Sequence, residues 1–119
     1  MARSLCILTS KAPYGGLAAK EALDAALIGA AFDLQVSILF DGDGVYQLLG
    51  QQNPAALGQK TFSAPLPALE LYGIERLLAS RDALESRGIT REQLCIEVEL
   101  LSSEALAQHL NDTDIVLGF

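Results

Sequence analysis

Short apolar runs alternate with helix-like segments along the 119-residue chain, and this alternation restricts the fold more than any other feature. A strand that is covered on both faces is a continuous apolar run, because neither face contacts water. Strands that are separated by helices form a parallel sheet with right-handed crossovers and helices on both faces. The length suits one domain, over residues 1–119. The predicted strands cover residues 4–9, 34–40, 74–80, 94–100 and 114–119.

The predicted helices rest on periodicity and on capping residues. Between the first two strands, apolar residues of the segment 17–31 recur at i, i+3, i+4 and i+7, as in a helix with one buried face. A short helical turn is expected at 45–49. Glycines that favour helix ends follow predicted helices at 65–72 and 82–87. The last helix, 104–110, begins after a serine cap, Ser102 or Ser103.

The fourth predicted strand differs from the others because its two faces differ. Its leucine, isoleucine and valine side chains share one face, and the other face carries Cys95, Glu97 and Glu99. A strand that presents two glutamates on one face is not covered on both sides, so we place it at or near an edge of the sheet.

Composition limits the classes of partner. Half of the residues are hydrophobic, and the mean hydropathy is +0.30. This high share of hydrophobic residues has two possible explanations. The residues either cover both faces of the sheet or form an interface with a partner protein, and an exposed apolar patch would favour the interface. Eight Lys and Arg stand against fifteen Asp and Glu, for a net charge of −7, and the basic residues do not cluster. Direct binding of tRNA or DNA, which needs clustered cations, is therefore not expected.

The two cysteines, Cys6 and Cys95, form no CxxC or Cys/His group, which fits a reducing compartment and predicts neither a disulfide nor a metal site. The N-terminal apolar run is short for a signal peptide. No stretch approaches the roughly 18 apolar residues of a membrane span. We expect a cytoplasmic protein that does not associate with membranes.

In a parallel α/β sheet, ligands bind at the carboxyl ends of the strands. This directs attention to the loops at 10–16 and 41–44 and to the turn at Ser80. The first loop carries no nucleotide fingerprint, which leaves a plain connecting loop or an anion-binding module as alternatives. An EF-hand that began at Asp41 would need Gly and Glu where the chain has Tyr46 and Gln52, so no metal is expected. No cofactor is expected.

No catalytic constellation emerges from the candidate nucleophiles. Cys6 lies within an apolar strand, where burial makes a thiol inert, and Cys95 alternates with glutamates, whose charge disfavours a thiolate. His109, the single histidine, is predicted to be solvated or to cap its helix. A binding or assembly module is the functional class that these residues support.

Five sequence blocks occur in an order and spacing that resemble the TusC/DsrF family, within the wider DsrE-like group. They are APYG at 12–15, DGDGVYQLL at 41–49, LYGI at 71–74, SRGI at 86–89 and DIVLGF at 114–119. The resemblance implies a three-layer α/β/α sandwich with a five-stranded parallel sheet (DsrE/F-like) as a single domain. It also implies a heterohexamer with TusB-like and TusD-like subunits. Such a complex passes persulfide sulfur from the carrier TusA to TusE, toward 2-thiouridine at the tRNA wobble position.

In the TusD/DsrE type of subunit, the active cysteine follows the third recognised strand, at the start of a short helix that ends in Arg-Gly. Counting back from Arg87 and Gly88 places the equivalent position at or near Ser80. Serine cannot form a persulfide, so the resemblance implies a subunit without a catalytic residue of its own. Such a subunit acts through contacts, for which aromatic and large apolar loop residues are suited. The predicted interface residues are Tyr14, Tyr46, Leu49 and Tyr72.

Two alternatives to a subunit of a TusBCD-type complex remain. The first is a DsrF-type subunit of a DsrEFH complex in sulfur oxidation. The second is a sulfurtransferase that acts through Cys95 or Cys6.

Overall fold

The computed structural model describes residues 3–13, 16–49, 69, 71–74 and 76–119. The predicted helix at 65–72 lies outside this part of the chain, except for residues 69, 71 and 72. The observed elements are the strands β1 (Ser4–Thr9), β2 (Gln35–Phe40), β3 (Arg76–Ser80), β4 (Glu99–Leu101) and β5 (Ile115–Gly118), the helices α1 (Ala18–Ala31), α2 (Arg81–Ser86) and α3 (Ser103–Asp112), and the 3-10 turns η1 (Gly42–Leu48) and η4 (Arg91–Gln93).

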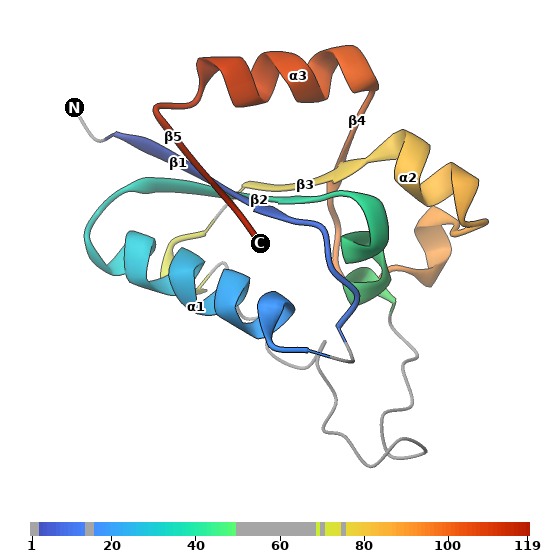
Figure 1. Cartoon of the computed structure of the whole chain (residues 1–119), viewed down its shortest axis with the longest axis horizontal. Helices are drawn as coiled ribbons and strands as arrows, with labels where there is room; N and C mark the ends of the chain where they lie inside the picture. The colour runs from blue at the N-terminus through green and yellow to red at the C-terminus, as the bar shows by residue number, and fades with distance from the viewer. Residues whose placement is uncertain (1–2, 14–15, 50–68, 70, 75) are drawn as a thin grey trace.

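The five strands form one sheet with the order β4-β3-β2-β1-β5, and all four pairings are parallel. Helix α1 lies on one face of this sheet and α3 on the other (Figure 1). The predicted three-layer α/β/α sandwich is therefore confirmed, as is the placement of the fourth strand at an edge.

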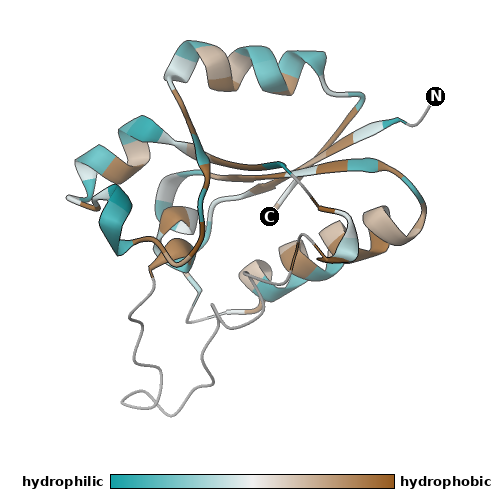
Figure 2. Cartoon of the chain, turned by 180° about the vertical axis from the view of Figure 1, so that it is seen from behind, coloured by the Kyte–Doolittle hydropathy of each residue, from teal (hydrophilic) through white to brown (hydrophobic). Residues whose placement is uncertain are grey.

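The two faces of the sheet are buried to different extents. On the α1 face, Leu5 and Ile7 of β1 pack with Val36 and Ile38 of β2 in the larger core cluster. A Cβ added to Gly29 of α1 would lie 2.7 Å from a Leu5 methyl, so α1 sits close to the sheet. The α3 face carries a smaller cluster of Cys6, Leu39, Leu78 and Leu101, and no residue of α3 is fully buried. Apolar residues therefore follow the sheet and the inner side of α1 (Figure 2).

The fourth strand is shorter than the alternation predicts. Only Glu99–Leu101 pairs with β3, and the preceding residues 94–98 lie outside the sheet. Their backbone is bonded elsewhere, because Leu94 forms an isolated antiparallel bridge with Leu49 and the Cys95 N–H donates to the Leu48 carbonyl at 2.7 Å. The predicted alternation of faces also fails there, since Cys95 packs partly against the same core as its neighbours.

The ends predicted for the helices at 17–31, 82–87 and 104–110 lie within two residues of the observed ends of α1, α2 and α3. Ser102, rather than Ser103, caps α3, and its Oγ accepts a hydrogen bond from the Ala105 N–H at 3.2 Å. The left-handed residue Gly88 (φ 67°) follows α2. The turn predicted at 45–49 begins earlier, as η1. Within the part of the chain that the structure describes, no helix is both long and apolar enough to cross a membrane.

Candidate functional site

The carboxyl ends of β1, β2 and β3 meet beneath η1 and α2, at the edge of the sheet that parallel topology favours for a site. Asp41 begins η1, and its side chain accepts a hydrogen bond from the Gly42 N–H at 2.8 Å. Gly44 brings this turn so close to β1 that an added Cβ would overlap the Thr9 carbonyl oxygen. The glycine-rich segment 41–44 is therefore needed for the close approach of η1 to β1, as expected of a tight strand-to-helix turn.

A buried glutamine connects this turn to the first loop. Gln47 of η1 is only 2% exposed, and its Nε2 donates to the Thr9 Oγ1 at 2.8 Å and to the Lys11 carbonyl at 2.9 Å. These bonds hold the start of the loop at 10–16 against η1. The role of Gln47 could not be predicted from the sequence, because the position of a glutamine in a turn does not show which loop lies opposite it.

Ser80 lies where β3 ends and α2 begins, and it is 6% exposed. Its Oγ accepts a hydrogen bond from the Ala83 N–H at 3.2 Å, which caps the helix. A thiol at this position would lie at a helix N-terminus, where a thiolate is favoured. Among the described residues, no histidine or carboxylate bonds to the Ser80 hydroxyl, so nothing there activates the hydroxyl as a nucleophile.

Arg87 fastens α2 to η1. Its guanidinium donates to one carboxylate oxygen of Asp43, from Nη2 at 3.0 Å and from Nε at 3.2 Å. The same group lies over the Tyr46 ring, 5.9 Å from its centroid, and Nη1 donates to the Ala83 carbonyl at 3.1 Å. Arg87, which follows the last residue of α2, therefore links α2 to η1.

Neither cysteine is set up as a nucleophile. Cys6 is fully buried, and burial raises the pKa of its thiol, opposed in part by a hydrogen bond from Ser37 and by the charge of Arg76. Burial also raises the pKa of Cys95, which is partly exposed. The prediction that neighbouring glutamates would disfavour the Cys95 thiolate was wrong about the cause. Within the described residues, no group of His, Cys, Asp or Glu could hold a metal ion.

His109 lies in the last turn of α3, as predicted, but its side chain is partly buried and bonds Ser37 instead of being solvated or capping the helix. It is partly buried against the sheet, with its Nε2 2.9 Å from the Ser37 Oγ. Burial lowers the pKa of its imidazole, and the charge of Arg76 lowers it further. The sequence placed His109 in the last turn of a helix, but it could not show that this turn packs against β2.

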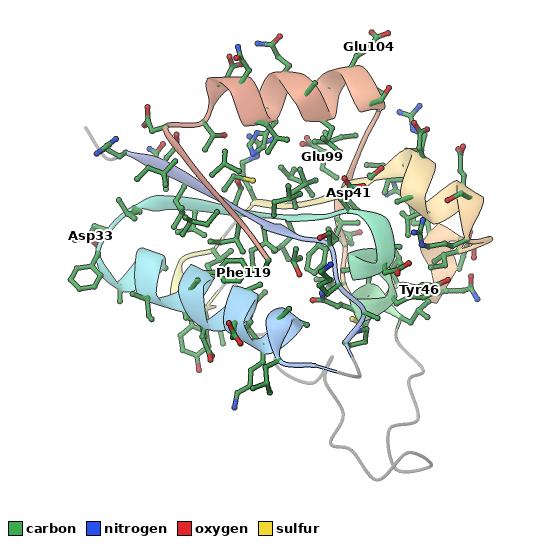
Figure 3. All side chains as sticks on the ribbon, viewed as in Figure 1. Asp33, Asp41, Tyr46, Glu99, Glu104 and Phe119 are labelled. Carbon is green, nitrogen blue, oxygen red and sulfur yellow. The ribbon has the colours of Figure 1, made fainter. Side chains whose placement is uncertain are left out.

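The predicted interface residues are in different surroundings. Tyr14 lies outside the described residues, whereas Tyr46 and Leu49 are partly exposed. Tyr46 lies near the carboxyl ends of the strands (Figure 3). Tyr72 is 62% exposed, and the neighbouring Leu71 is 87% exposed. Two large side chains that are adjacent in the sequence are therefore exposed to solvent. Their exposure favours a partner interface as the explanation of the high mean hydropathy.

The chain is similar in sequence and in fold to known proteins. The model of the DsrE/DsrF-like family matches residues 3–119. A "Protein TusC homolog" of Pseudomonas aeruginosa is 44% identical over 98% of both chains. The "Intracellular sulfur oxidation protein DsrF" of Allochromatium vinosum is 39% identical over 94% of this chain and 93% of the relative. The crystal structure of the ychN protein from E. coli has a TM-score of 0.83 and 24% identity over 98% and 99% of the two chains, which shows the same fold.

Proposed function

The chain belongs to the DsrE/DsrF-like family, and on this premise we propose that it is a non-catalytic subunit of a TusBCD-type sulfur-relay complex. The observation that supports the proposal is that the Ser80 hydroxyl caps α2. The family resemblance implies that the active type of subunit has its cysteine at or near this position. Persulfide transfer needs a sulfur atom that is attacked and released, and a serine oxygen cannot replace it.

The cysteines that the chain does contain support the same proposal. Cys6 has no exposed surface, and burial raises the thiol pKa of both Cys6 and Cys95, which lowers the thiolate fraction at neutral pH. A sulfur relay through this chain would have to start from one of these two thiols. We therefore assign the transferred sulfur to a cysteine of the TusD-like subunit.

The proposed contribution of this chain is assembly. TusB-like and TusD-like subunits would bind it in a heterohexamer, through Tyr14, Tyr46, Leu49 and Tyr72. The exposure of Tyr72 supports this role. The complex would work in the cytoplasm, exchange sulfur with TusA and TusE, and serve 2-thiouridine formation in tRNA. The chain itself would contact no nucleic acid, consistent with its net charge of −7.

The test is co-expression of the tagged chain with TusB-like and TusD-like subunits, followed by exposure of the purified complex to a persulfide donor. All three chains are expected to co-elute. Intact-mass spectrometry should find one added sulfur atom on the TusD-like subunit and none on this chain. If this chain gains the sulfur and Cys95→Ser or Cys6→Ser abolishes the gain, the chain is itself a carrier and the proposal is wrong. Failure to co-elute would rule out the assembly role.

A second candidate is the DsrF-type role in sulfur oxidation, which the 39% identity to the DsrF relative favours. Deleting the gene that encodes the chain and measuring 2-thiouridine in bulk tRNA distinguishes the TusC-type role from the DsrF-type role. Loss of the modification supports the TusC-type role. Unchanged tRNA together with slower oxidation of stored sulfur supports the DsrF-type role.

A further inference from the structure

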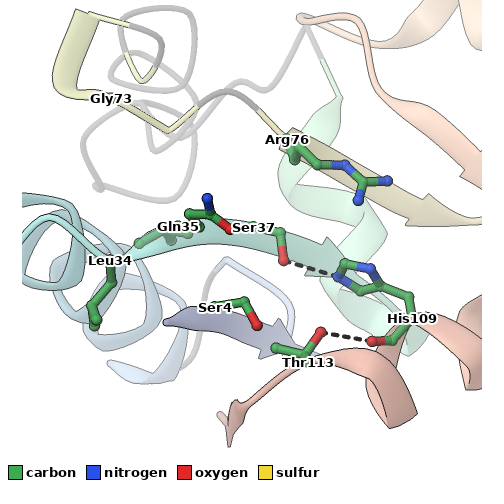
Figure 4. A pocket seen from close by; sticks show the side chains of 9 residues that line it. Ser4, Leu34, Gln35, Ser37, Gly73, Arg76, His109 and Thr113 are labelled. Carbon is green, nitrogen blue, oxygen red and sulfur yellow. Dashed lines mark hydrogen bonds between the residues drawn. The ribbon is translucent and has the colours of Figure 1, made fainter. Parts of the chain in front are cut away.

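A second polar site lies at the other end of the strands, where their amino ends meet the end of α3. Here a groove of about 410 Å³ opens between the amino ends of β1, β2 and β3 and the turn after α3 (Figure 4). Leu34, Val36 and Gly73 line part of it, although the Val36 side chain packs in the core on the α1 face. Its polar lining consists of Ser4, Gln35, Ser37, Arg76, His109 and Thr113. The volume falls in the range of small-molecule sites.

Hydrogen bonds fix the wall of the groove on the α3 side. The Thr113 Oγ1 donates to the His109 carbonyl at 2.6 Å, which closes the end of α3. The Ser4 N–H donates to an Asp114 carboxylate oxygen, and the Asp114 N–H donates to the Ser4 Oγ, both at 2.9 Å. The turn between α3 and β5 is therefore tied to β1, and the imidazole is held over β2.

Arg76 reaches the same place from the neighbouring strand. Ser37 and Arg76 are direct partners in the β2–β3 register, so their side chains emerge side by side on the α3 face. Ser37 in turn lies 2.9 Å from the His109 Nε2. The Arg76 Nη2 donates to Glu99 at 2.8 Å in an exposed ion pair. Among the described residues, no hydrogen bond uses the Nε or Nη1 of this guanidinium.

We propose that this groove binds a small organic carboxylate, with Arg76 pairing the carboxylate and His109 donating a second hydrogen bond to it. The guanidinium is a planar fork that matches a carboxylate, and Glu99, which does not line the groove, bonds only its Nη2. The volume of the groove leaves room for a short carbon skeleton beside the charged end. This site is separate from the Ser80 edge and independent of the proposed sulfur-relay role.

One nitrogen of His109 already has a partner. The His109 Nε2 lies 2.9 Å from the Ser37 Oγ, within hydrogen-bond distance. The Nδ1 nitrogen remains for the ligand. The charged and titratable groups that face the imidazole are Arg76 on β3, Glu99 on β4, Asp112 on α3 and, through Ser37, Cys6 on β1.

Ligand binding and protonation are therefore linked. Burial and Arg76 lower the pKa of His109 in the free protein, so the imidazole is mostly neutral at pH 7. A bound carboxylate partly neutralises Arg76 and accepts from a protonated Nδ1, and both effects raise this pKa. By linkage, the carboxylate must bind more tightly as the pH falls through the titration of His109.

The test uses the fact that His109 is the single histidine, so its imidazole NMR signals need no assignment. The purified protein is titrated with pH in the presence of succinate, acetate, sulfate or chloride at matched ionic strength. The proposal requires a saturable upward shift of the His109 pKa with succinate or acetate. An equal shift with chloride is ionic screening and would overturn it, and so would stronger binding of sulfate than of either carboxylate.

Matched variants assign the binding to Arg76. Arg76→Gln should weaken carboxylate binding at least tenfold, whereas Arg81→Gln, an exposed arginine of α2, should leave it unchanged. Glu99→Gln removes the competing carboxylate and should tighten binding. Calorimetry on His109→Gln should show weaker binding that no longer depends on pH near neutrality. Binding that persists in Arg76→Gln, with the fold confirmed by circular dichroism, would refute the assignment.

Discussion

Replacing Ser80 by alanine removes the oxygen that caps α2. The Ser80 Oγ accepts from the Ala83 N–H at 3.2 Å, and Ser80 is 6% exposed. Loss of a serine cap costs about 0.5–2 kcal/mol. Because the site is buried, water has little access to the N–H that loses its partner. We therefore expect the upper half of this range, about 1–2 kcal/mol of the free energy of unfolding.

The expected change can be measured as a melting temperature. The entropy of unfolding is about 2.1 cal/mol/K per residue, or about 0.25 kcal/mol/K for 119 residues. A loss of about 1–2 kcal/mol then lowers the Tm by about 4–8 °C, measured by far-UV circular dichroism. Ser102→Ala is a matched control, because Ser102 caps α3 at the same 3.2 Å distance but is partly exposed. Water can replace that cap, so its cost should be the smaller of the two.

The same variant separates a structural role of Ser80 from a chemical one. Well below the lowered Tm, a complex that contains Ser80→Ala should pass sulfur at the wild-type rate, because the hydroxyl only caps the helix. An unchanged Tm would refute the capping argument. A folded Ser80→Ala complex that no longer transfers sulfur would show that the hydroxyl takes part in the chemistry, and the assignment of a non-catalytic subunit would fail.

Three further predictions test other parts of the structure. Tyr72→Ser should leave the Tm of the chain nearly unchanged, because the ring is 62% exposed, but should reduce co-purification of the partner subunits. Gly44→Ala, whose Cβ meets the Thr9 backbone, should cost more than about 2 kcal/mol in urea unfolding. Gly29→Ala, whose nearest neighbour is a movable Leu5 methyl, should cost less. The lowered pKa of His109 means that the unfolded chain binds more protons, so stability should fall as the pH drops below about 6.5 and level off below the folded pKa. His109→Gln should remove this part of the pH dependence.

The strands, their parallel pairing and several helix ends could be predicted because each depends on residues close together in the sequence. The run at 5–8 is apolar because β1 is covered on both faces, and Ser102 caps α3 because a serine oxygen is within reach of an N–H three residues on. Glu97 and Glu99 of the predicted fourth strand likewise indicated a place at the edge of the sheet, although only Glu99 lies in β4. Ser80 could be singled out because the ordered sequence blocks resemble the TusC/DsrF family, and counting back from Arg87 and Gly88 leads to this position.

Contacts between distant elements were decided by the tertiary structure alone. The alternation at 94–100 predicts a full strand, yet the backbone of Leu94 and Cys95 is bonded to the end of η1 instead of to β3. Ser37 and His109 are 72 positions apart and meet only because α3 packs over β2. Arg76 joins them through the register of β3. Periodicity shows which face of an element is apolar, but which polar side chains meet depends on how the elements dock, and that docking is set by the packing of the whole sheet.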